Sequence, residues 1–440
     1  MTAPTTRPRS AADACPGLGR PFSAADGTLV RLRPAGRAIE VDTLVTLMNI
    51  IAKHHDPSIQ LTSRAALQLR GLPDPLTPDV RAVIAATGLV PSVTHELVRN
   101  IIVSPLSGLD SGGLADVRTV AANLDSAVCA EPALTRLGGR FLFAVDDGRG
   151  DVIGEGFDLG LVMTGPDRCV VLAGRDRQGW EVSLEAAVPL LVDLALDFVQ
   201  RASGDESDWH VADLAEPLQR GDAVETMLPL RPPPPLGAVG PHAVVAVPLG
   251  LLRPSHVAAL ARVTDEVRLT PWRSLVVEEG ASSLSSLEAA GLVTHADSPW
   301  SRLHACTGLP GCTRSTLDTR ALAVELAPVL PNGRLPVHIS GCARRCGTPS
   351  TAYVDVLSPI SLDDALATIT TTTRVPALAT DTPATTPPTR VGSFSATRGA
   401  GAAPSAASGA HSDALGCAVP SDPGGEGAHS RGAATRKTWM

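Results

Sequence analysis

Lysine is almost absent from this chain of 440 residues, which contains only Lys53 and Lys437. Basic charge is therefore carried by arginine, whose guanidinium stays protonated and pairs bidentately with carboxylates. The net charge of −8 argues against nucleic acid as the main partner. Aromatic residues make up 3% of the chain. Because lysine is almost absent, we expect any anion-binding site inside the fold to be built from arginines.

Long apolar runs are also missing. No stretch reaches the roughly 18 apolar residues of a membrane span, and the first residues show no apolar signal-peptide core. We expect no membrane contact and a cytoplasmic location. No G-x-G-x-x-G follows a predicted strand, as a dinucleotide-binding fold would require. Any NADH would then be used through a partner protein.

Half of the eight cysteines form two close pairs. Cys306 and Cys312 are spaced C-x5-C, and Cys342 and Cys346 are spaced C-x3-C. Thiolates select zinc, Cu(I) or iron–sulfur centres. Structural zinc sites favour about two to four residues between paired cysteines, so the five-residue gap favours iron–sulfur. Disulfides and buried free thiols remain the alternatives.

The first part of the chain has the pattern of an α+β half-domain. GTLVRLRP predicts a strand that places Arg31 and Arg33 on one face. Residues 41–51 have helical spacing, and residues 58–72 read as strand, turn, strand. Two further helices are predicted at about 77–87 and 184–201.

A second segment repeats this pattern. LTSRAALQL beginning at Leu61 reappears as LTPWRSLVV beginning at Leu269, an offset of 208. Three further matches share an offset of 203: Gly88 with Gly291, Arg99 with Arg302, and Gly108 with Gly311. These ordered matches predict a duplication. At this offset Val103 and Leu109 stand where the second copy has Cys306 and Cys312, so one half alone is expected to hold metal.

The cysteine motifs resemble the cluster motif of the sulfite and nitrite reductase family. This resemblance implies an α+β fold with a duplicated, pseudo-two-fold arrangement of ferredoxin-like half-domains and sulfite-reductase-type 4Fe-4S/tetrapyrrole domains. We expect these segments: 1–20, flexible N-terminus; 21–88, first half-domain; 89–228, tetrapyrrole-binding domain; 229–242, Pro-rich linker; 243–293, second half-domain; 294–367, 4Fe-4S-binding domain; 368–440, disordered tail.

The resemblance extends to the arginines. Thr62, Arg64 and Gln68 match the family's T-x-R-x3-Q segment, which holds tetrapyrrole carboxylates. A solvated surface is the alternative for any single arginine. The expected tetrapyrrole-binding set is Arg31, Arg33, Arg64, Gln68, Arg70, Arg99, Asn100 and Arg140.

One departure separates branches of the family. Sulfite and nitrite reductases carry K-x-K on a strand where this chain has Arg140 and Leu142, which removes a charge that grips the small anion. Residues 14–357, and RLTPWR in particular, resemble the precorrin-3B synthase branch. This resemblance implies oxygen-dependent hydroxylation of precorrin-3A at C20, with γ-lactone formation. The alternatives are a sirohaem-dependent nitrite or sulfite reductase and a non-catalytic iron–sulfur redox or sensor protein.

The resemblance also implies the cofactors and partners. A 4Fe-4S cluster is expected on Cys306, Cys312, Cys342 and Cys346, with electrons from a ferredoxin or an NADH-linked reductase. A mononuclear non-haem iron is a further expectation, and sirohaem belongs to the reductase alternative. No spacing selects the iron ligands or a catalytic residue. The candidates for the iron are His54, His55, Asp56, His95, Glu96, Asp146, Asp147, His304 and His338.

Overall fold

A computed structural model describes residues 13, 15–174, 178–202, 209–218, 223–225, 230–349 and 351–374. Within these ranges the chain forms four β-sheets and eight α-helices in an α+β architecture. The described helices include none with the length and apolar character needed to cross a bilayer.

Two five-stranded sheets form the half-domains, and each takes its last strand from the other half of the chain. Strand β14 pairs with β4, and β3 pairs with β15, both antiparallel. This reciprocal exchange is the pattern expected of a duplicated unit with two-fold pseudosymmetry, and it confirms the predicted duplication. The first sheet has the order β1 (Phe22–Ala24), β2 (Gly27–Leu32), β5 (Leu67–Leu72), β4 (Ile59–Leu61), β14 (Leu251–Leu252); the second has β12 (Gly237–Val239), β13 (His242–Ala246), β16 (Ser274–Val277), β15 (Glu266–Leu269), β3 (Ile39–Glu40).

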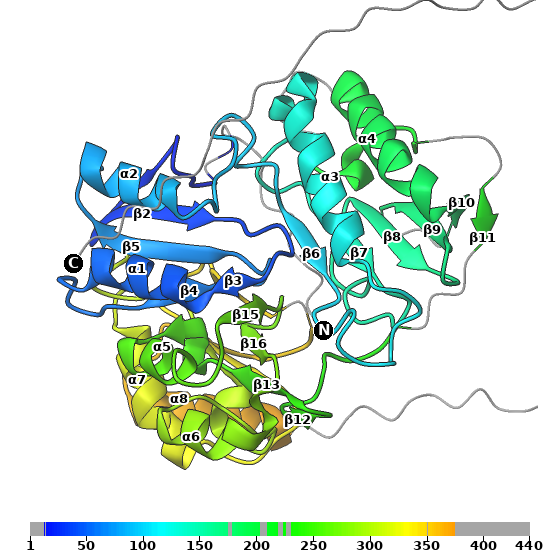
Figure 1. Cartoon of the computed structure of the whole chain (residues 1–440). Helices are drawn as coiled ribbons and strands as arrows, with labels where there is room; N and C mark the ends of the chain where they lie inside the picture. The colour runs from blue at the N-terminus through cyan, green and yellow to red at the C-terminus, as the bar shows by residue number, and fades with distance from the viewer. Residues whose placement is uncertain are drawn as a thin grey trace, which may run out of the picture. The chain divides into compact units, whose positions relative to one another are not determined.

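The half-domains share one apolar core. Helix α1 (Val41–Ile51) buries Leu44, Leu47 and Ile51 on one face, as its spacing predicts. It packs against its counterpart α5 (Pro254–Leu260), and both lie beside the sheets in Figure 1. Buried residues of both half-domains belong to the same core. Helices α2 (Pro78–Ala86) and α6 (Leu284–Ala289) occupy the corresponding later positions of the two copies.

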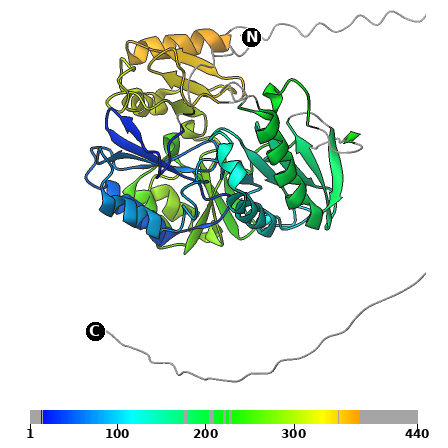
Figure 2. The ribbon, with the colours of Figure 1, turned by 90° about the horizontal axis from the view of Figure 1, so that it is seen from above.

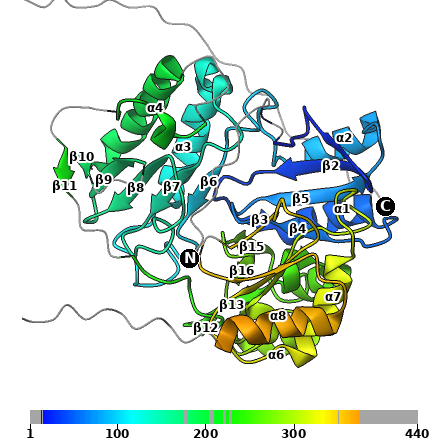
Figure 3. The same cartoon turned by 180° about the vertical axis from the view of Figure 1, so that it is seen from behind.

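Each half-domain is followed by a domain that begins with parallel strands. In the first, α3 (Arg118–Ala130) and α4 (Leu184–Arg201) pack together on one face of the sheet (Figure 1). In the second, α8 (Leu362–Arg374) packs on β19 and on α7 (Thr319–Leu326), as Figures 2 and 3 show. The first sheet has the order β11 (Val224–Glu225), β10 (Gln178–Ser183), β9 (Arg168–Ala173), β8 (Leu159–Met163), β7 (Phe143–Asp146), β6 (Ile101–Val103); the second has β17 (Leu303–Ala305), β18 (Val337–Ser340), β19 (Val354–Leu357).

The backbone corrects the register of the repeat by one residue in this region. The amide of Ser104 donates to the carbonyl of Val145, and the amide of Cys306 donates to that of Ile339. Ser104 is therefore the counterpart of Cys306, and Val103 is not. The loops that follow have equal length, so Asp110, and not Leu109, is the counterpart of Cys312. The matches of Arg99 with Arg302 and of Gly108 with Gly311 are wrong by the same single residue.

Three expected segment ends also differ. Leu18 is buried in the shared core, because the carboxylate of Glu96 accepts the amides of Leu18 and Gly19 at 2.6 Å. Ordered structure thus begins before residue 21. Strand β12 lies inside the expected linker, and α8 continues past residue 368 to Arg374. The rest of the expected tail, from residue 375, lies outside the described residues, as do residues 1–12 and 14.

Candidate functional site

The four paired cysteines lie in two loops at one edge of a sheet. Strands β17 and β18 are parallel neighbours, so their carboxyl ends meet at the same edge. Cys306 directly follows β17, and Cys342 follows β18 after a single glycine. We call residues 306–318 and 341–353 the cluster loops. The fold therefore brings Cys306 and Cys342, one from each pair, to the same edge of the sheet.

Gly341 ties the two loops together. Its amide donates to Cys306 Sγ over 3.3 Å, an N–H···S bond that stabilises a thiolate. A Cβ on Gly341 would lie 1.8 Å from Ser315 Oγ, so no larger residue fits. Thr319 Oγ1 donates to the Cys306 carbonyl over 2.8 Å and fixes the first loop from helix α7. Glycine is required here by space, as the sequence predicts for a residue beside sulfur.

These loops fit an iron–sulfur cluster better than a single ion. None of the four cysteines forms a disulfide, and three of them are half-buried while Cys346 is exposed. In the part of the chain that the structure describes, no three His, Cys, Asp or Glu side chains converge closely enough to hold one metal ion. A polynuclear cluster binds each thiolate through a different iron, so its ligands need not converge on one point. The cluster assignment remains a prediction.

Arg31, Arg33 and Arg64 form a cationic group in the first half-domain, which we call the arginine cradle. Arg31 and Arg33 lie at the end of β2, and Arg64 lies in the turn between β4 and β5. Burial, together with the charges of Arg31 and Arg64 nearby, lowers the pKa of Arg33 to about 10. Burial also lowers the pKa values of Arg31 and Arg64. The cradle thus concentrates positive charge in a place with little water.

The cradle leaves polar hydrogens without partners. Arg31 Nε and one terminal nitrogen of Arg33 are buried and have no hydrogen-bond partner among the described residues. A buried, unpaired cationic donor is costly, so a site of this kind is completed by a bound anion. The fold therefore supports an anion-binding role for Arg31, Arg33 and Arg64.

Two other residues of the expected set hold the cradle in position. Asn100 Oδ1 accepts from Arg33 Nε over 2.8 Å, while its amide nitrogen donates to the Gly139 and Phe141 carbonyls. Gln68 accepts from Arg31 over 3.0 Å. Both amides are buried. They position the cradle arginines, and a contact of Gln68 or Asn100 with a ligand remains a prediction.

Arg140 lies at the exposed rim of the cradle. Its carbonyl accepts from Arg64 over 2.6 Å, and its guanidinium carbon lies 4.3 Å from the centre of the Trp209 ring. A guanidinium over an indole face is held by a cation–π interaction. Leu142, two residues on, is buried and adds no charge.

Arg99 and Arg70 point elsewhere, which corrects the expected set. Arg99 is 1% exposed and forms a bidentate pair with Asp125, with both N–O distances at 2.6 Å. Arg70 binds Asp26 and donates to the Gly311 carbonyl over 2.7 Å. Arg99 is therefore a structural residue. Arg70 braces the first cluster loop instead of facing the cradle.

Two residues near the N-terminus also face the cradle, contrary to the flexible segment expected there. Asp13 accepts from the Gly139 amide over 2.6 Å and from the Cys15 amide over 3.0 Å. Burial raises the pKa of Cys15, although the nearby Arg31 and Arg33 oppose this. The sequence around Cys15 carries no pattern from which a contact with the arginines could be inferred.

The candidates for a separate iron do not converge. His54 and His55 stack with their ring centres 4.1 Å apart, but the Asp56 carboxylate pairs with Arg253 and Arg320. The His95 ring binds Ser92 and the Glu131 carbonyl, and the Glu96 carboxylate accepts two backbone amides. The Asp146 carboxylate accepts four backbone amides, and Asp147 forms an ion pair with Arg149. His304 binds Arg273, and His338 is buried, with the Cys346 backbone and the Tyr353 ring close to its own ring. No iron ligand set follows from these contacts.

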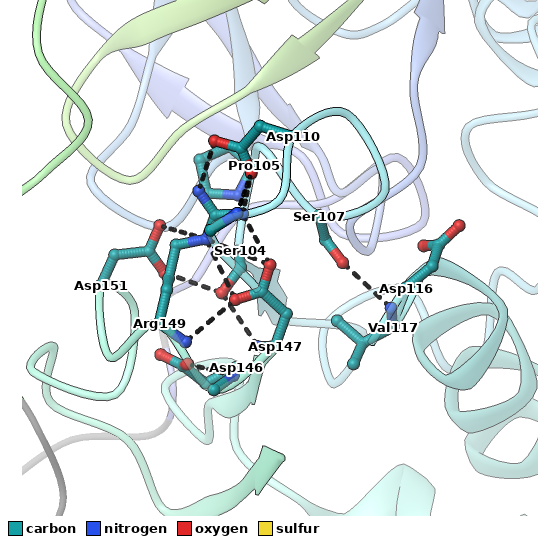
Figure 4. A network of polar contacts seen from close by, with 12 residues as sticks. Ser104, Pro105, Ser107, Asp110, Asp116, Val117, Asp146, Asp147, Arg149 and Asp151 are labelled. Atoms are coloured by element: carbon teal, nitrogen blue, oxygen red, sulfur yellow. Dashed lines mark hydrogen bonds and ion pairs between the residues drawn. The ribbon is translucent and has the colours of Figure 1, made fainter. Parts of the chain in front are cut away.

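A network of charged residues occupies the place in the first copy that corresponds to the cluster loops (Figure 4). Arg149 forms ion pairs with Asp110 at 2.6 Å and with Asp147 at 2.9 Å. Asp151 accepts from Ser104 Oγ over 2.7 Å. Burial, reinforced by the charge of Asp146, raises the pKa of Asp151 to about 7. Sequence reasoning missed this network because the register of the repeat was one residue off.

Comparisons with known proteins agree with this architecture. Residues 23–87 match the family described as the nitrite/sulfite reductase ferredoxin-like half domain. The NirA protein of Mycobacterium tuberculosis has a similar structure, with a TM-score of 0.57 over 73% of this chain and 69% of that chain, at 20% identity. The first half-domain is therefore similar to that of nitrite and sulfite reductases, and the fold is similar to that of NirA.

Two curated relatives are similar to about three quarters of this chain. A precorrin-3B synthase of Sinorhizobium sp. is 28% identical over 376 residues, which cover 78% of this chain and 80% of the relative. A ferredoxin–nitrite reductase of Synechococcus elongatus is 28% identical over 392 residues, which cover 75% of this chain and 76% of the relative. The resemblance to precorrin-3B synthase within this family is thereby confirmed.

Proposed function

We propose that this protein is an oxidoreductase of the precorrin-3B synthase type, acting on precorrin-3A as its tetrapyrrole substrate. The reaction is hydroxylation at C20 with γ-lactone formation. One atom of O2 enters the product and the other leaves as water, so two electrons and two protons must come from a donor. A ferredoxin or an NADH-linked reductase is the donor we expect.

The arginine cradle is the observation that carries this proposal. A reduced tetrapyrrole has acetate and propionate side chains around its rim, and guanidinium groups pair bidentately with such carboxylates. Arg31, Arg33 and Arg64 provide buried cationic donors, two of which have unpaired nitrogens. Asn100 and Gln68 hold these side chains in place before a ligand arrives. Preorganisation of this kind reduces the entropy lost on binding.

Cys306, Cys312, Cys342 and Cys346 would hold the iron–sulfur cluster. When bound, such a cluster supplies single-electron transfer between the donor and the site of oxygen chemistry. Ser315 leaves no space for a side chain at Gly341, and the Gly341 amide donates to Cys306 Sγ. Arg70, from the first half-domain, braces the first cluster loop.

A sirohaem-dependent nitrite or sulfite reductase is the second candidate, supported by the ferredoxin–nitrite reductase relative. Leu142, which directly precedes β7, argues against it, because its buried side chain cannot contribute the positive charge that a small inorganic anion requires. Arg140, two residues earlier, is a cation, and it is held over Trp209.

The absorbance spectrum of protein purified without oxygen separates these candidates. The hydroxylase should show the broad iron–sulfur absorbance alone, and a reductase should also show the Soret and red bands of sirohaem. The protein is then given precorrin-3A, O2 and a reductant, and the product is analysed by mass spectrometry. Stoichiometric sirohaem in the purified protein would exclude the first proposal. A cluster-containing protein without sirohaem that forms no product would point to the non-catalytic redox or sensor protein.

A further inference from the structure

Arg273 lies in the turn between β15 and β16 with φ of +56°, a left-handed conformation unusual for arginine. The same turn recurs in the first copy, where Ala65 has φ of +48°. In both turns a threonine amide donates to the carbonyl four residues on, from Thr270 and from Thr62. The backbone conformation therefore belongs to the duplicated hairpin. The guanidinium is specific to the copy that carries the cysteines.

The Arg273 side chain connects both cluster loops. One terminal nitrogen donates to His304 Nδ1 over 3.0 Å, and the other donates to the Gly347 carbonyl over 3.1 Å. His304 lies two residues before Cys306, and Gly347 directly follows Cys346. A guanidinium only donates, so Nδ1 accepts and the proton of the neutral His304 ring is on Nε2. Arg273 thus contacts a neighbour of each cysteine pair.

The stem of Arg273 is fixed by close packing. A Cβ on Gly250, which has φ of +70°, would lie 2.9 Å from Arg273 Cδ. The side chain lines a cavity of about 190 Å³ whose walls include Trp272, Trp300 and Leu303. Arg273 is half-buried, which reduces the screening of its charge by water. Burial lowers the pKa of Arg273, and an arginine remains charged at neutral pH.

No carboxylate neutralises Arg273 in the described part of the chain, where its hydrogen bonds go to a ring nitrogen and a carbonyl. Arg149, in the first-copy region that corresponds to the cluster loops, lies among Asp110, Asp147 and Asp151. One copy therefore compensates its buried arginine with acids. The cysteine-bearing copy leaves the positive charge free to act on whatever the cluster loops hold.

We propose that Arg273 sets the redox potential of the iron–sulfur cluster by placing an uncompensated positive charge beside both cysteine pairs. One-electron reduction makes the cluster more negative, and a nearby cation stabilises the reduced form. The potential is thereby raised, which makes the cluster easier to reduce by its donor. This inference rests on the proposed function only in requiring a cluster on the four cysteines.

The test is a redox titration of the purified protein with sodium dithionite, in which the reduced cluster is followed by electron paramagnetic resonance. Arg273→Gln removes the charge and keeps a donor group, and it should shift the midpoint potential to more negative values. Arg273→Lys keeps the charge and should stay close to the wild type. Arg168→Gln is the matched control, because Arg168 pairs with Glu181 in the first-copy domain and lies on the surface. It should leave the potential unchanged.

The variants separate the possible results. Equal potentials in wild type, Arg273→Gln and Arg273→Lys would overturn the proposal, and so would a shift of the same size in Arg168→Gln. If Arg273→Gln holds no cluster, Arg273→Lys decides: a wild-type potential supports the proposal and a shifted one overturns it. A wild-type protein without any cluster would overturn the assignment of the four cysteines, and this inference with it. Hydroxylase activity does not enter the measurement, so a failure of the reaction and a failure of this inference can be told apart.

Discussion

The amide of Asp147 donates to Ser104 Oγ over 3.2 Å, in the place where the amide of Gly341 donates to Cys306 Sγ over 3.3 Å. A second pair of bonds extends the match. The amide of Leu114 donates to the Asp147 carbonyl, as that of Thr316 does to the Gly341 carbonyl. A hydroxyl thus replaces the thiol in one copy, and Arg149 with its aspartates lies where the other copy has the cluster loops.

Replacing Ser104 with alanine should destabilise the first copy without affecting the cluster. The change leaves the Asp147 amide and the Asp151 carboxylate, both buried, without their hydroxyl partner. Each buried group without a partner costs about 1–3 kcal/mol, so the free energy of unfolding should fall by roughly 2–4 kcal/mol. Urea unfolding measures the loss, and iron and sulfide content should equal those of the wild type. A loss of iron in Ser104→Ala would contradict the independence of the two sites.

Asp151 should make stability depend on pH. Its pKa is raised to about 7, so the folded state keeps this proton at pH values where the unfolded state has already lost it. Stability should therefore fall as pH rises from about 4 to about 7 and level off above, by about 1.4 kcal/mol for each unit of pKa between the two states. Asp151→Asn keeps the acceptor for Ser104 and should remove this fall. Urea unfolding at a series of pH values checks it.

Asp110 provides a control whose contribution to stability changes with pH in the opposite direction. Its bonds from Arg149 outweigh its burial and lower its pKa, so its contribution is present above its unfolded pKa and is lost as the solution becomes more acidic. Asp110→Asn should therefore reduce stability at neutral pH and leave the fall that Asp151 causes. The same change of slope in both variants would contradict the assignment to Asp151.

The half-domains could be predicted from sequence because their signals are local. The sequence around Arg31 predicts a strand, and the spacing of residues 41–51 predicts a helix. The structure contains both, as β2 and α1. The exchanged strands β3 and β14 could not be predicted, because two residues carry no periodicity. Arg99 shows a similar limit for the site. Asp125, which neutralises the charge of Arg99, lies 26 residues away in the sequence, so the pairing is visible only in the folded structure.

Cys346→Ser should abolish the iron–sulfur cluster. An oxygen ligand is harder than a thiolate and binds iron–sulfur centres less strongly. The iron and sulfide content and the visible absorbance should fall to background. Cys129→Ser, in helix α3 of the first-copy domain, is the matched control and should retain full content. A Cys346→Ser protein with an unchanged cluster would remove Cys346 from the ligand set.

Arg64→Ala should weaken tetrapyrrole binding and leave the cluster intact. Arg64 gives the cradle a guanidinium, and its hydrogen bond goes to the Arg140 carbonyl at the rim, away from the core. Hydrogen bonds to charged groups contribute about 1.5–3 kcal/mol, which corresponds to roughly 10- to 100-fold in the dissociation constant. Binding is measured by absorbance titration under anaerobic conditions, with Arg168→Ala as the surface control. Normal affinity in Arg64→Ala would exclude Arg64 from the substrate site.

Arg99 and Asp125 allow a test of structure against binding. Arg99→Ala leaves the Asp125 carboxylate buried and uncompensated, and the free energy of unfolding should fall by about 3–5 kcal/mol. Replacing both partners, as Arg99→Met with Asp125→Leu, should recover most of that loss, because an apolar pair of similar volume needs no compensation. Since the hydrogen bonds of Arg99 go to Asp125 and the Leu89 carbonyl and not to the cradle, the double variant should bind precorrin-3A with wild-type affinity. A stable double variant that loses affinity at least tenfold would show that Arg99 reaches the substrate, against the contacts found here.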